Sequence, residues 1–118
     1  MDASFSVRNI MLLPVCQQSN VTLIAGGKGI RRTVQHVTVF ESKEAISHMK
    51  GGEFLLSGGY NFTQEETLQR EIVRKLNGNG IAAILIKSGN YFPEIPSAII
   101  QECDALNLPL FELPHNMS

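Results

Sequence analysis

The sequence predicts a single α/β domain built around a parallel sheet. From Phe54 onward, short apolar runs alternate with segments whose apolar residues recur at helical spacing, in the order strand, helix, strand, helix, strand. The run IAAILI at 81–86 is apolar throughout, as is typical of a central strand covered on both faces. The length of 118 residues suits one core. We expect one α/β domain over residues 1–118, with an N-terminal helix and a β-hairpin before a β-α-β-α-β parallel-sheet unit.

Two short helices are expected before the parallel unit. Ser6 is a suitable N-cap for the first, which Pro14 helps to end. Ser42 is a suitable N-cap for the second, whose inward-facing residues would be Ala45, Ile46 and Met49. The pair Gly51–Gly52 ends this second helix, because glycine reaches left-handed backbone angles at little cost.

Segments 20–27 and 31–41 predict an antiparallel hairpin between these helices. The first, NVTLIAGG, is rich in β-branched residues, and the following KG would form the turn. The second, RRTVQHVTVFE, has the period of a strand. Its two faces differ, with Val37 and Val39 on one and His36, Thr38 and Phe40 on the other.

The parallel unit is expected to use strands near 54–56, 81–86 and 110–113. Thr63 and Glu66 match a capping box for the helix between the first two strands. The apolar stripe of that helix is Leu68, Ile72, Val73 and Leu76. Pro96 suits the first turn of the next helix, whose stripe is Ile99, Ile100, Cys103 and Leu106.

Composition argues against several classes of protein. The formal net charge of −1 is far from the basic charge of a free-standing nucleic-acid-binding module, so we expect no direct nucleic-acid binding. The longest apolar run, 81–86, is too short to cross a bilayer, and the N-terminus lacks the features of a secretory signal. Cys16 and Cys103 are isolated, as expected of reduced thiols. These features predict a cytoplasmic protein without a membrane partner.

Neither catalysis nor metal binding is expected. The three histidines, His36, His48 and His115, have no ligand spacing with one another or with a cysteine. Asp2 and Asp104 are the only aspartates, which leaves few candidates for a Ser-His-Asp arrangement. We therefore predict that the chain is not an enzyme and uses no cofactor or metal.

A ligand site is expected at the carboxyl ends of the strands, where open parallel sheets bind their ligands. The stretch SGGYNFT joins a strand to a helix, so its amide groups could receive an anion or a polar ligand; a tight turn is the alternative. Lys87 emerges directly after the central strand and could grip a ligand together with Glu41, or form a salt link with it. The candidate ligand-binding residues are Glu41, Ser57, Gly58, Gly59, Lys87 and Ser88.

A basic cluster at the expected hairpin turn consists of Lys28, Arg31 and Arg32. Charged side chains at a sheet edge discourage pairing with other strands, so we interpret this cluster as a solvated edge. Contact with a partner domain or an acidic ligand is the alternative.

Four segments between about Ser6 and Pro114 form a recognisable series, in the order SVRNIMLLP, VTLIAGGKGIRRTVQHVTVFE, MKGGEFLLSGG and GIAAILIKSG…EIPSAIIQECDALNLPLFELP. In these segments the chain resembles the N-terminal domain of PucR-type purine catabolism regulators. In that family the domain heads a longer bacterial transcription regulator, in which a central domain and a C-terminal helix-turn-helix segment follow. The resemblance implies a regulatory domain, and a fragment of a longer regulator, without catalytic residues.

Two functions fit this resemblance. The first is an effector-sensing domain that binds a small, purine-like metabolite at the carboxyl rim of the sheet. The second is a dimerisation or interdomain scaffold module without a small ligand. A homodimer is expected in either case, because bacterial regulators commonly bind paired half-sites.

Overall fold

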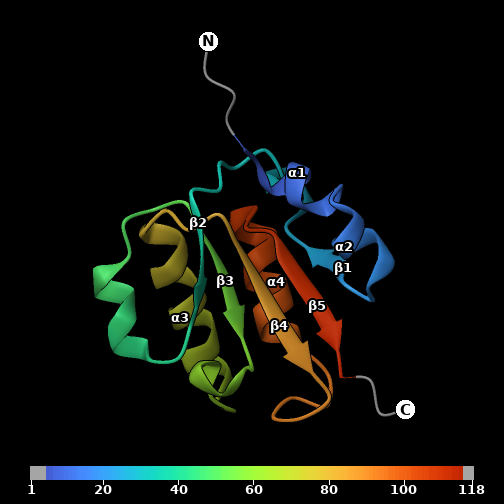
Figure 1. Ribbon diagram of the computed structural model, residues 1–118. Coiled ribbons are helices and arrows are strands. Elements are labelled where there is room, and N and C mark those ends of the chain that lie inside the picture. The colour runs from blue at the N-terminus through green and yellow to red at the C-terminus, as the bar shows by residue number, and fades with distance from the viewer. Residues whose placement is uncertain (1–4, 116–118) are drawn as a thin grey trace.

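The computed structural model describes residues 5–115, which contain a five-stranded sheet of order β1-β5-β4-β3-β2 (Figure 1). The strands are β1 (Thr22–Ala25), β2 (His36–Val39), β3 (Glu53–Ser57), β4 (Ala83–Ser88) and β5 (Leu110–Pro114). The α-helices are α1 (Val7–Met11), α2 (Pro14–Gln18), α3 (Glu66–Gly78) and α4 (Ser97–Leu106). Short 3-10 helices are η1 (Gly27–Gly29), η2 (Lys43–His48) and η3 (Tyr60–Phe62).

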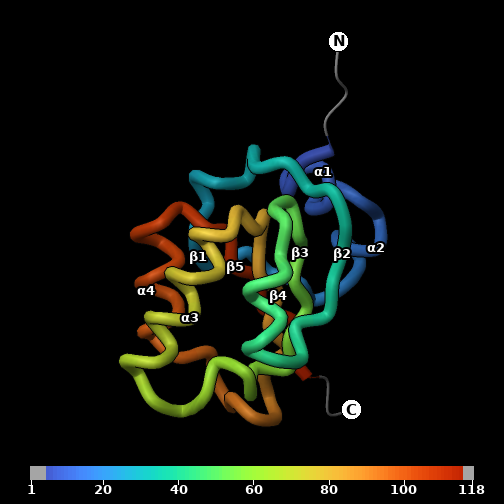
Figure 2. Tube along the Cα trace, turned by 90° about the vertical axis from the view of Figure 1, so that its left-hand side faces the viewer, coloured from blue at the N-terminus to red at the C-terminus, as the bar shows by residue number. Residues whose placement is uncertain are grey.

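The predicted α/β fold and its parallel unit are confirmed. Strands β2, β3, β4 and β5 are parallel and lie in sequence order. Right-handed crossovers between neighbours in sequence order bring α3 and α4 to the same face of the sheet. Figure 2 shows these two helices on one side of the sheet and α1 and α2 on the other.

The predicted N-terminal hairpin is wrong. β1 pairs antiparallel with β5, whereas β2 pairs parallel with β3, so the two strands lie at opposite edges of the sheet. A hairpin needs a tight connection, but residues 26–35 cross from one edge of the sheet to the other. Gly26 begins this crossing with φ 69°, and a Cβ there would collide with the backbone of Leu108. Its N–H donates to the Asp104 carboxylate at 2.7 Å, which directs the chain away from a turn.

The predicted helices form, with altered ends. Ser6 caps α1 as expected, but Pro14 also begins α2, which the sequence analysis did not predict. Ser42 caps the second short helix, which is the 3-10 helix η2. The capping box at the start of α3 is wrong, because Glu65 is the N-cap and its side chain accepts from the Thr67 N–H. Pro96 is the N-cap of α4 and not part of its first turn.

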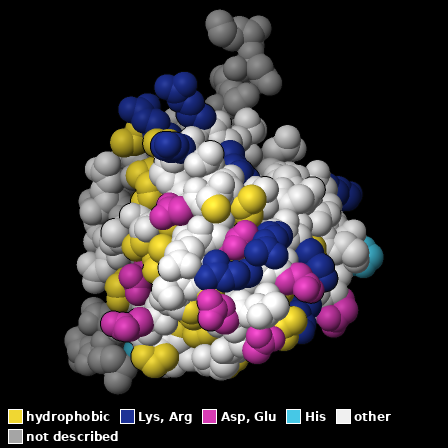
Figure 3. Space-filling view, turned by 180° about the vertical axis from the view of Figure 1, so that it is seen from behind, with side chains coloured by type: hydrophobic (Ala, Val, Ile, Leu, Met, Phe, Trp, Pro, Cys, Tyr) yellow, Lys and Arg dark blue, Asp and Glu magenta, His cyan; other side chains and the backbone are white. Residues whose placement is uncertain are grey.

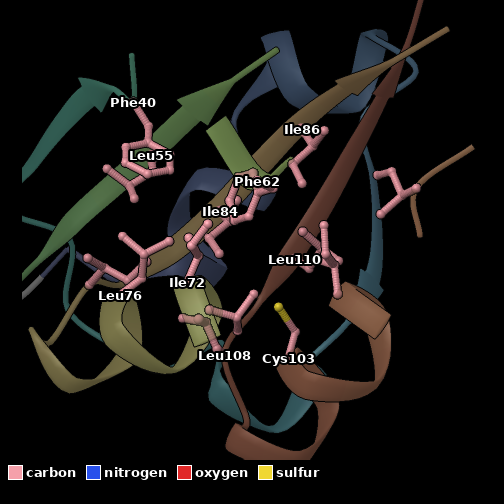
Figure 4. Packing of buried hydrophobic residues seen from close by; sticks show 14 of the residues in the cluster. Phe40, Leu55, Phe62, Ile72, Leu76, Ile84, Ile86, Cys103, Leu108 and Leu110 are labelled. Atoms are coloured by element: carbon pink, nitrogen blue, oxygen red, sulfur yellow. The ribbon is translucent and has the colours of Figure 1, made fainter. Parts of the chain in front are cut away.

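The main core lies between the sheet and the helices α3 and α4 (Figure 4). The strands contribute Leu55, Ile84, Ile86 and Leu110, and the helices contribute Ile72, Leu76 and Cys103. A smaller cluster on the opposite face includes Val7, Val34, Phe54 and Phe111. β4 is thus covered fully on one face only, which corrects the expectation of helices over both faces.

The outer surface of α3 and α4 carries interspersed acidic and basic side chains (Figure 3). Arg70 and Arg74 of α3 both form ion pairs with Glu102 of α4, at 3.4 and 2.9 Å.

None of the helices within residues 5–115 has the length and apolar character that a membrane-spanning helix needs.

Candidate functional site: the open face of the sheet and its carboxyl rim

The rim residues predicted from the sequence divide between the two faces of the sheet. Side chains alternate along a strand, so Ser57 and Ser88 share the helix-covered face with Leu55 and Ile86, whereas Lys87 points to the other face. Both serines are buried, with 7% and 2% of their surface exposed. Their hydroxyl groups have partners within the protein: Ser57 Oγ accepts from the Gly59 N–H at 2.9 Å, and Ser88 Oγ donates to a Glu112 carboxylate oxygen at 2.6 Å.

A shallow hollow of about 330 Å³ lies at the carboxyl ends of the strands. It is lined by Val39, Leu56, Ser57, Gly58, Leu85, Lys87 and Leu113. The structure therefore brings three predicted site residues together there, Ser57, Gly58 and Lys87. Glu41, Gly59 and Ser88 are not among the residues that line it. The floor of this rim hollow is apolar, and the Lys87 ammonium is its charged group.

The two glycines after β3 have different roles. Gly59 has φ 103°, and a Cβ there would lie 2.7 Å from the Phe92 ring. Its N–H also donates back to Ser57, so Gly59 closes the turn into η3. Gly58 has exposed surface, and a Cβ there would make ordinary contact with Tyr60 at 3.5 Å. The turn interpretation therefore accounts for Gly59, and Gly58 remains available at the hollow.

The expected salt link between Glu41 and Lys87 is absent from the ion pairs formed within residues 5–115. Glu41 is exposed beyond the end of β2, at the edge of the sheet. The Lys87 ammonium is accordingly not neutralised by Glu41.

A larger groove, which sequence analysis did not predict, lies between the sheet and the α1–α2 segment. Its volume is about 870 Å³, and apolar side chains from both walls dominate its lining. On the sheet these are Leu23, Val37, Phe54, Leu56, Leu85 and Phe111. Leu56 and Leu85 also line the rim hollow, so groove and hollow form one apolar surface. The feature of the sequence that could have revealed this groove was the apolar face formed by Val37 and Val39, for which no covering helix was predicted.

We call this surface the open face. It consists of Val37, Val39, Phe54, Leu56, Leu85, Phe111 and Leu113. Val37 and Val39 are 59% and 58% exposed, whereas Phe54 and Phe111 lie buried beneath the α1–α2 segment. The open face is thus uncovered toward β2 and toward the carboxyl rim.

At the amino end of the sheet, the charged groups have a structural role. Burial by itself raises the pKa of Glu53, but hydrogen bonds hold that pKa below its ordinary value. The donors are the N–H groups of Lys50 at 2.7 Å and Gly51 at 3.0 Å, the Glu53 N–H and the side chain of His36.

Burial of the Cys103 thiol raises its pKa to about 12, which makes it a poor nucleophile at neutral pH.

The expected solvated basic edge is wrong for Arg32. Its guanidinium donates to the carbonyl oxygens of Ile81 and Leu106, both at 3.0 Å, and to the Asn77 side chain at 2.8 Å. Burial lowers the pKa of Arg32. Arg32 therefore ties the crossing segment to the ends of α3 and α4. Lys28 and Arg31 are exposed.

Among residues 5–115, no three His, Cys, Asp or Glu side chains lie close enough together to hold a metal ion. The charged group that lines the rim hollow is the Lys87 ammonium, and Gln17 and Ser19 add polar groups to the lining of the larger groove.

Comparison with known proteins places the chain among bacterial regulators through a family model and a curated relative. The model of the purine catabolism regulatory protein-like family, PucR, matches residues 9–118. The purine catabolism regulatory protein of Bacillus subtilis (strain 168) is 29% identical over 112 residues, which cover 95% of this chain and 21% of that relative. The chain thus spans about a fifth of the length of this relative. With the family model matched over nearly the whole chain, the protein belongs to the purine catabolism regulatory protein-like family.

Proposed function

We propose that this chain is the effector-sensing domain of a cytoplasmic transcription regulator and that a small, purine-like metabolite binds in the rim hollow. The proposal rests on the juxtaposition of the Lys87 side chain and the chain at Ser57–Gly58 around an apolar floor; the Ser57 hydroxyl is already bonded to the Gly59 N–H. A flat heterocycle would lie against Leu56 and Leu85, because small-molecule sites combine an apolar lining with a few polar groups.

Lys87 selects the chemistry of this ligand. Its ammonium donates hydrogen bonds and carries a positive charge, so a ring carbonyl or an anionic ring oxygen is the matching group. The Gly58 backbone provides the second polar contact at the hollow. Glu41, Gly59 and Ser88 lie outside the lining, so the proposed contacts do not depend on them. The name of the Bacillus subtilis relative supports a ligand from purine catabolism.

Because the chain corresponds to about a fifth of that relative, we assign DNA binding to another part of the full-length regulator. The formal net charge of −1 and the mixed charges on α3 and α4 support this assignment. The protein is not an enzyme in this proposal.

A thermal-shift panel of xanthine, urate, allantoin and guanine tests the proposed ligand. A ligand at a hundredfold excess over its dissociation constant stabilises the folded state by about 2.7 kcal/mol. For a domain of this size we expect a rise in Tm of several degrees, about ten at most.

Lys87→Ala should remove this rise while leaving the Tm of the unliganded protein near that of wild type, because Lys87 is exposed. Lys28→Ala, at an exposed lysine in η1, is the matched control and should respond like wild type. If no compound raises the Tm, or if Lys87→Ala still responds, the rim hollow is not a metabolite site.

A second function is favoured by the exposure of Val37 and Val39 on the open face. Exposed apolar patches mark interaction sites, so we also propose that the domain forms a homodimer. Analytical ultracentrifugation at tens of micromolar tests this proposal directly. A strictly monomeric protein would contradict it.

A further inference from the structure

Strand β2, which is four residues long, forms an edge of the sheet without lysine, proline or a bulge. Natural edge strands are blunted by lysine, proline or a bulge, or are covered. β1, at the other edge, has a register shift between Leu23 and Ala25. β2 pairs with β3 without a shift, and its sequence HVTV contains neither lysine nor proline. Figure 2 shows β2 at the margin of the sheet, away from α4.

The backbone of β2 presents a defined set of hydrogen-bonding groups at this edge. The N–H groups of His36 and Phe40 donate inward, to Gly52 and Leu56 next to and within β3. Alternate residues of a strand direct their backbone groups to opposite sides, so Val37 and Val39 direct their N–H and C=O groups outward. Their side chains meanwhile lie on the open face.

We propose that a second copy of this chain pairs with β2 in antiparallel orientation, across a two-fold axis at Thr38. Val37 then exchanges both of its backbone hydrogen bonds with Val39 of the partner subunit, and Val39 does the same with Val37 of the partner subunit. Thr38 faces Thr38 of the partner subunit in a non-hydrogen-bonded pair. The two five-stranded sheets become one continuous sheet.

The sequence of β2 is complementary to itself in this register. Each outward donor meets an outward acceptor, which is the requirement of an isologous two-fold interface. On the open face the cross-strand neighbours are two valine–valine pairs, a favourable combination of β-branched residues. Further out, His36 faces Phe40 and Gln35 faces Glu41 of the partner subunit, so no like charges are opposed. This inference rests on the homodimer proposed above; the pairing itself requires no metabolite, although Val39 also lines the rim hollow.

Sedimentation velocity on the whole chain at tens of micromolar tests the interface. Wild type should sediment as a dimer. The double variant Val37→Lys/Val39→Lys should be monomeric at the same concentration, because it opposes like charges across the axis, and its Tm should stay near that of wild type because both side chains are exposed. Val15→Lys is the matched control, at a 69% exposed valine in α2, and should remain dimeric.

A cysteine cross-link tests the register. Facing residues of a non-hydrogen-bonded antiparallel pair have Cα atoms about 4.5 Å apart, within the range that a disulfide spans. Thr38→Cys in a Cys16→Ser background should therefore form an intermolecular disulfide under mild oxidation, and Cys103 is buried and should not interfere. His36→Cys is the control and should not cross-link, because the two copies of residue 36 are offset along the strand.

The outcomes separate the proposals. A monomeric wild type overturns both the dimer and the β2 interface. A dimer that persists in Val37→Lys/Val39→Lys, or one in which Thr38→Cys fails to cross-link, overturns the β2 interface but leaves a dimer through another surface. The thermal shift with purine-like compounds is unaffected by either result.

Discussion

The two faces of the sheet are built from the same strands but differ in how they are covered. On the covered face, α3 and α4 bury Leu55, Ile84 and Ile86. On the open face, the short helices α1 and α2 cover Phe54 and Phe111, whereas Leu56 and Leu85 remain partly exposed. One face therefore holds the main core, and the other leaves apolar side chains partly exposed.

The physical basis of this difference is the order of the strands. Because β2 to β5 follow one another in the sheet, right-handed crossovers bring both long helices to the same side. The N-terminal segment alone remains for the other side, and its helices are short. A sheet with a switch in strand order would have been covered on both faces.

The largest expected effect comes from two single variants of β4, one with a charge on the covered face and one with a charge on the open face. Ile84→Asp should unfold the domain, because an unpaired carboxylate in the covered core costs at least about 4–5 kcal/mol, comparable with the whole stability of a small domain. Leu85→Asp, one residue along and partly exposed, should remain folded with a lowered Tm. Circular dichroism melts measure both. An Ile84→Asp protein that melts like wild type would contradict the placement of this strand in the core.

Two milder substitutions in β3 compare the same two faces. Leu55→Ala on the covered face should lower the free energy of unfolding by about 3 kcal/mol, because it leaves a cavity in a closed core. Leu56→Ala on the open face should cost about 1 kcal/mol, because water already reaches this side chain. Urea titration of the two variants gives the difference. Equal losses would indicate that the open face is covered in solution, as by a partner subunit.

An effect smaller than that of Leu55→Ala is expected at Glu53, a buried carboxylate at the amino end of β3. Its pKa is lower in the folded state than its ordinary value of 4.5, so folding is favoured by ionisation. That contribution is fully present above the unfolded pKa and is lost as pH falls through the folded one. Glu53→Gln should therefore cost about 1–2 kcal/mol at pH 7, and its deficit relative to wild type should shrink below about pH 4.

Urea titrations of wild type and Glu53→Gln at both pH values measure this linkage. Glu44→Gln, at an exposed carboxylate in η2, is the control for the substitution itself and should change the free energy of unfolding little at pH 7. A constant deficit at all pH values would mean that the Glu53 carboxylate is not stabilised in its ionised form.

Local sequence patterns were sufficient to predict the elements of the parallel unit. The apolar run 81–86 and the helical periods around Ile72 and Ile99 specify strands and helices through the spacing of their side chains, and short crossovers then leave a parallel sheet. For the same reason, the alternation around Thr38 correctly predicted a strand whose valines share one face. The family resemblance read from these segments is likewise confirmed.

The partners of the two N-terminal strands were decided only by the tertiary structure. An alternating pattern shows that a segment is a strand, but it carries no information on which strand lies beside it. Here Gly26, held against Leu108 and Asp104, turns the chain away from a hairpin, and Arg32 fastens the crossing segment to α3 and α4. These contacts join residues far apart in the chain, so no local window of sequence contains them.

For the candidate rim residues too, the sequence predicted one part of the arrangement and the tertiary structure decided the rest. The sequence placed Ser57, Gly58, Lys87 and Ser88 at the ends of neighbouring strands, and the register of β3 and β4 confirms that they lie at one end of the sheet. Which side chains meet depended on pleating across the sheet, which sends Lys87 to the open face and Ser88 to Glu112 on the other. The open face itself followed from the crossing of residues 26–35, because that crossing leaves β2 at an edge where Val37 and Val39 are exposed.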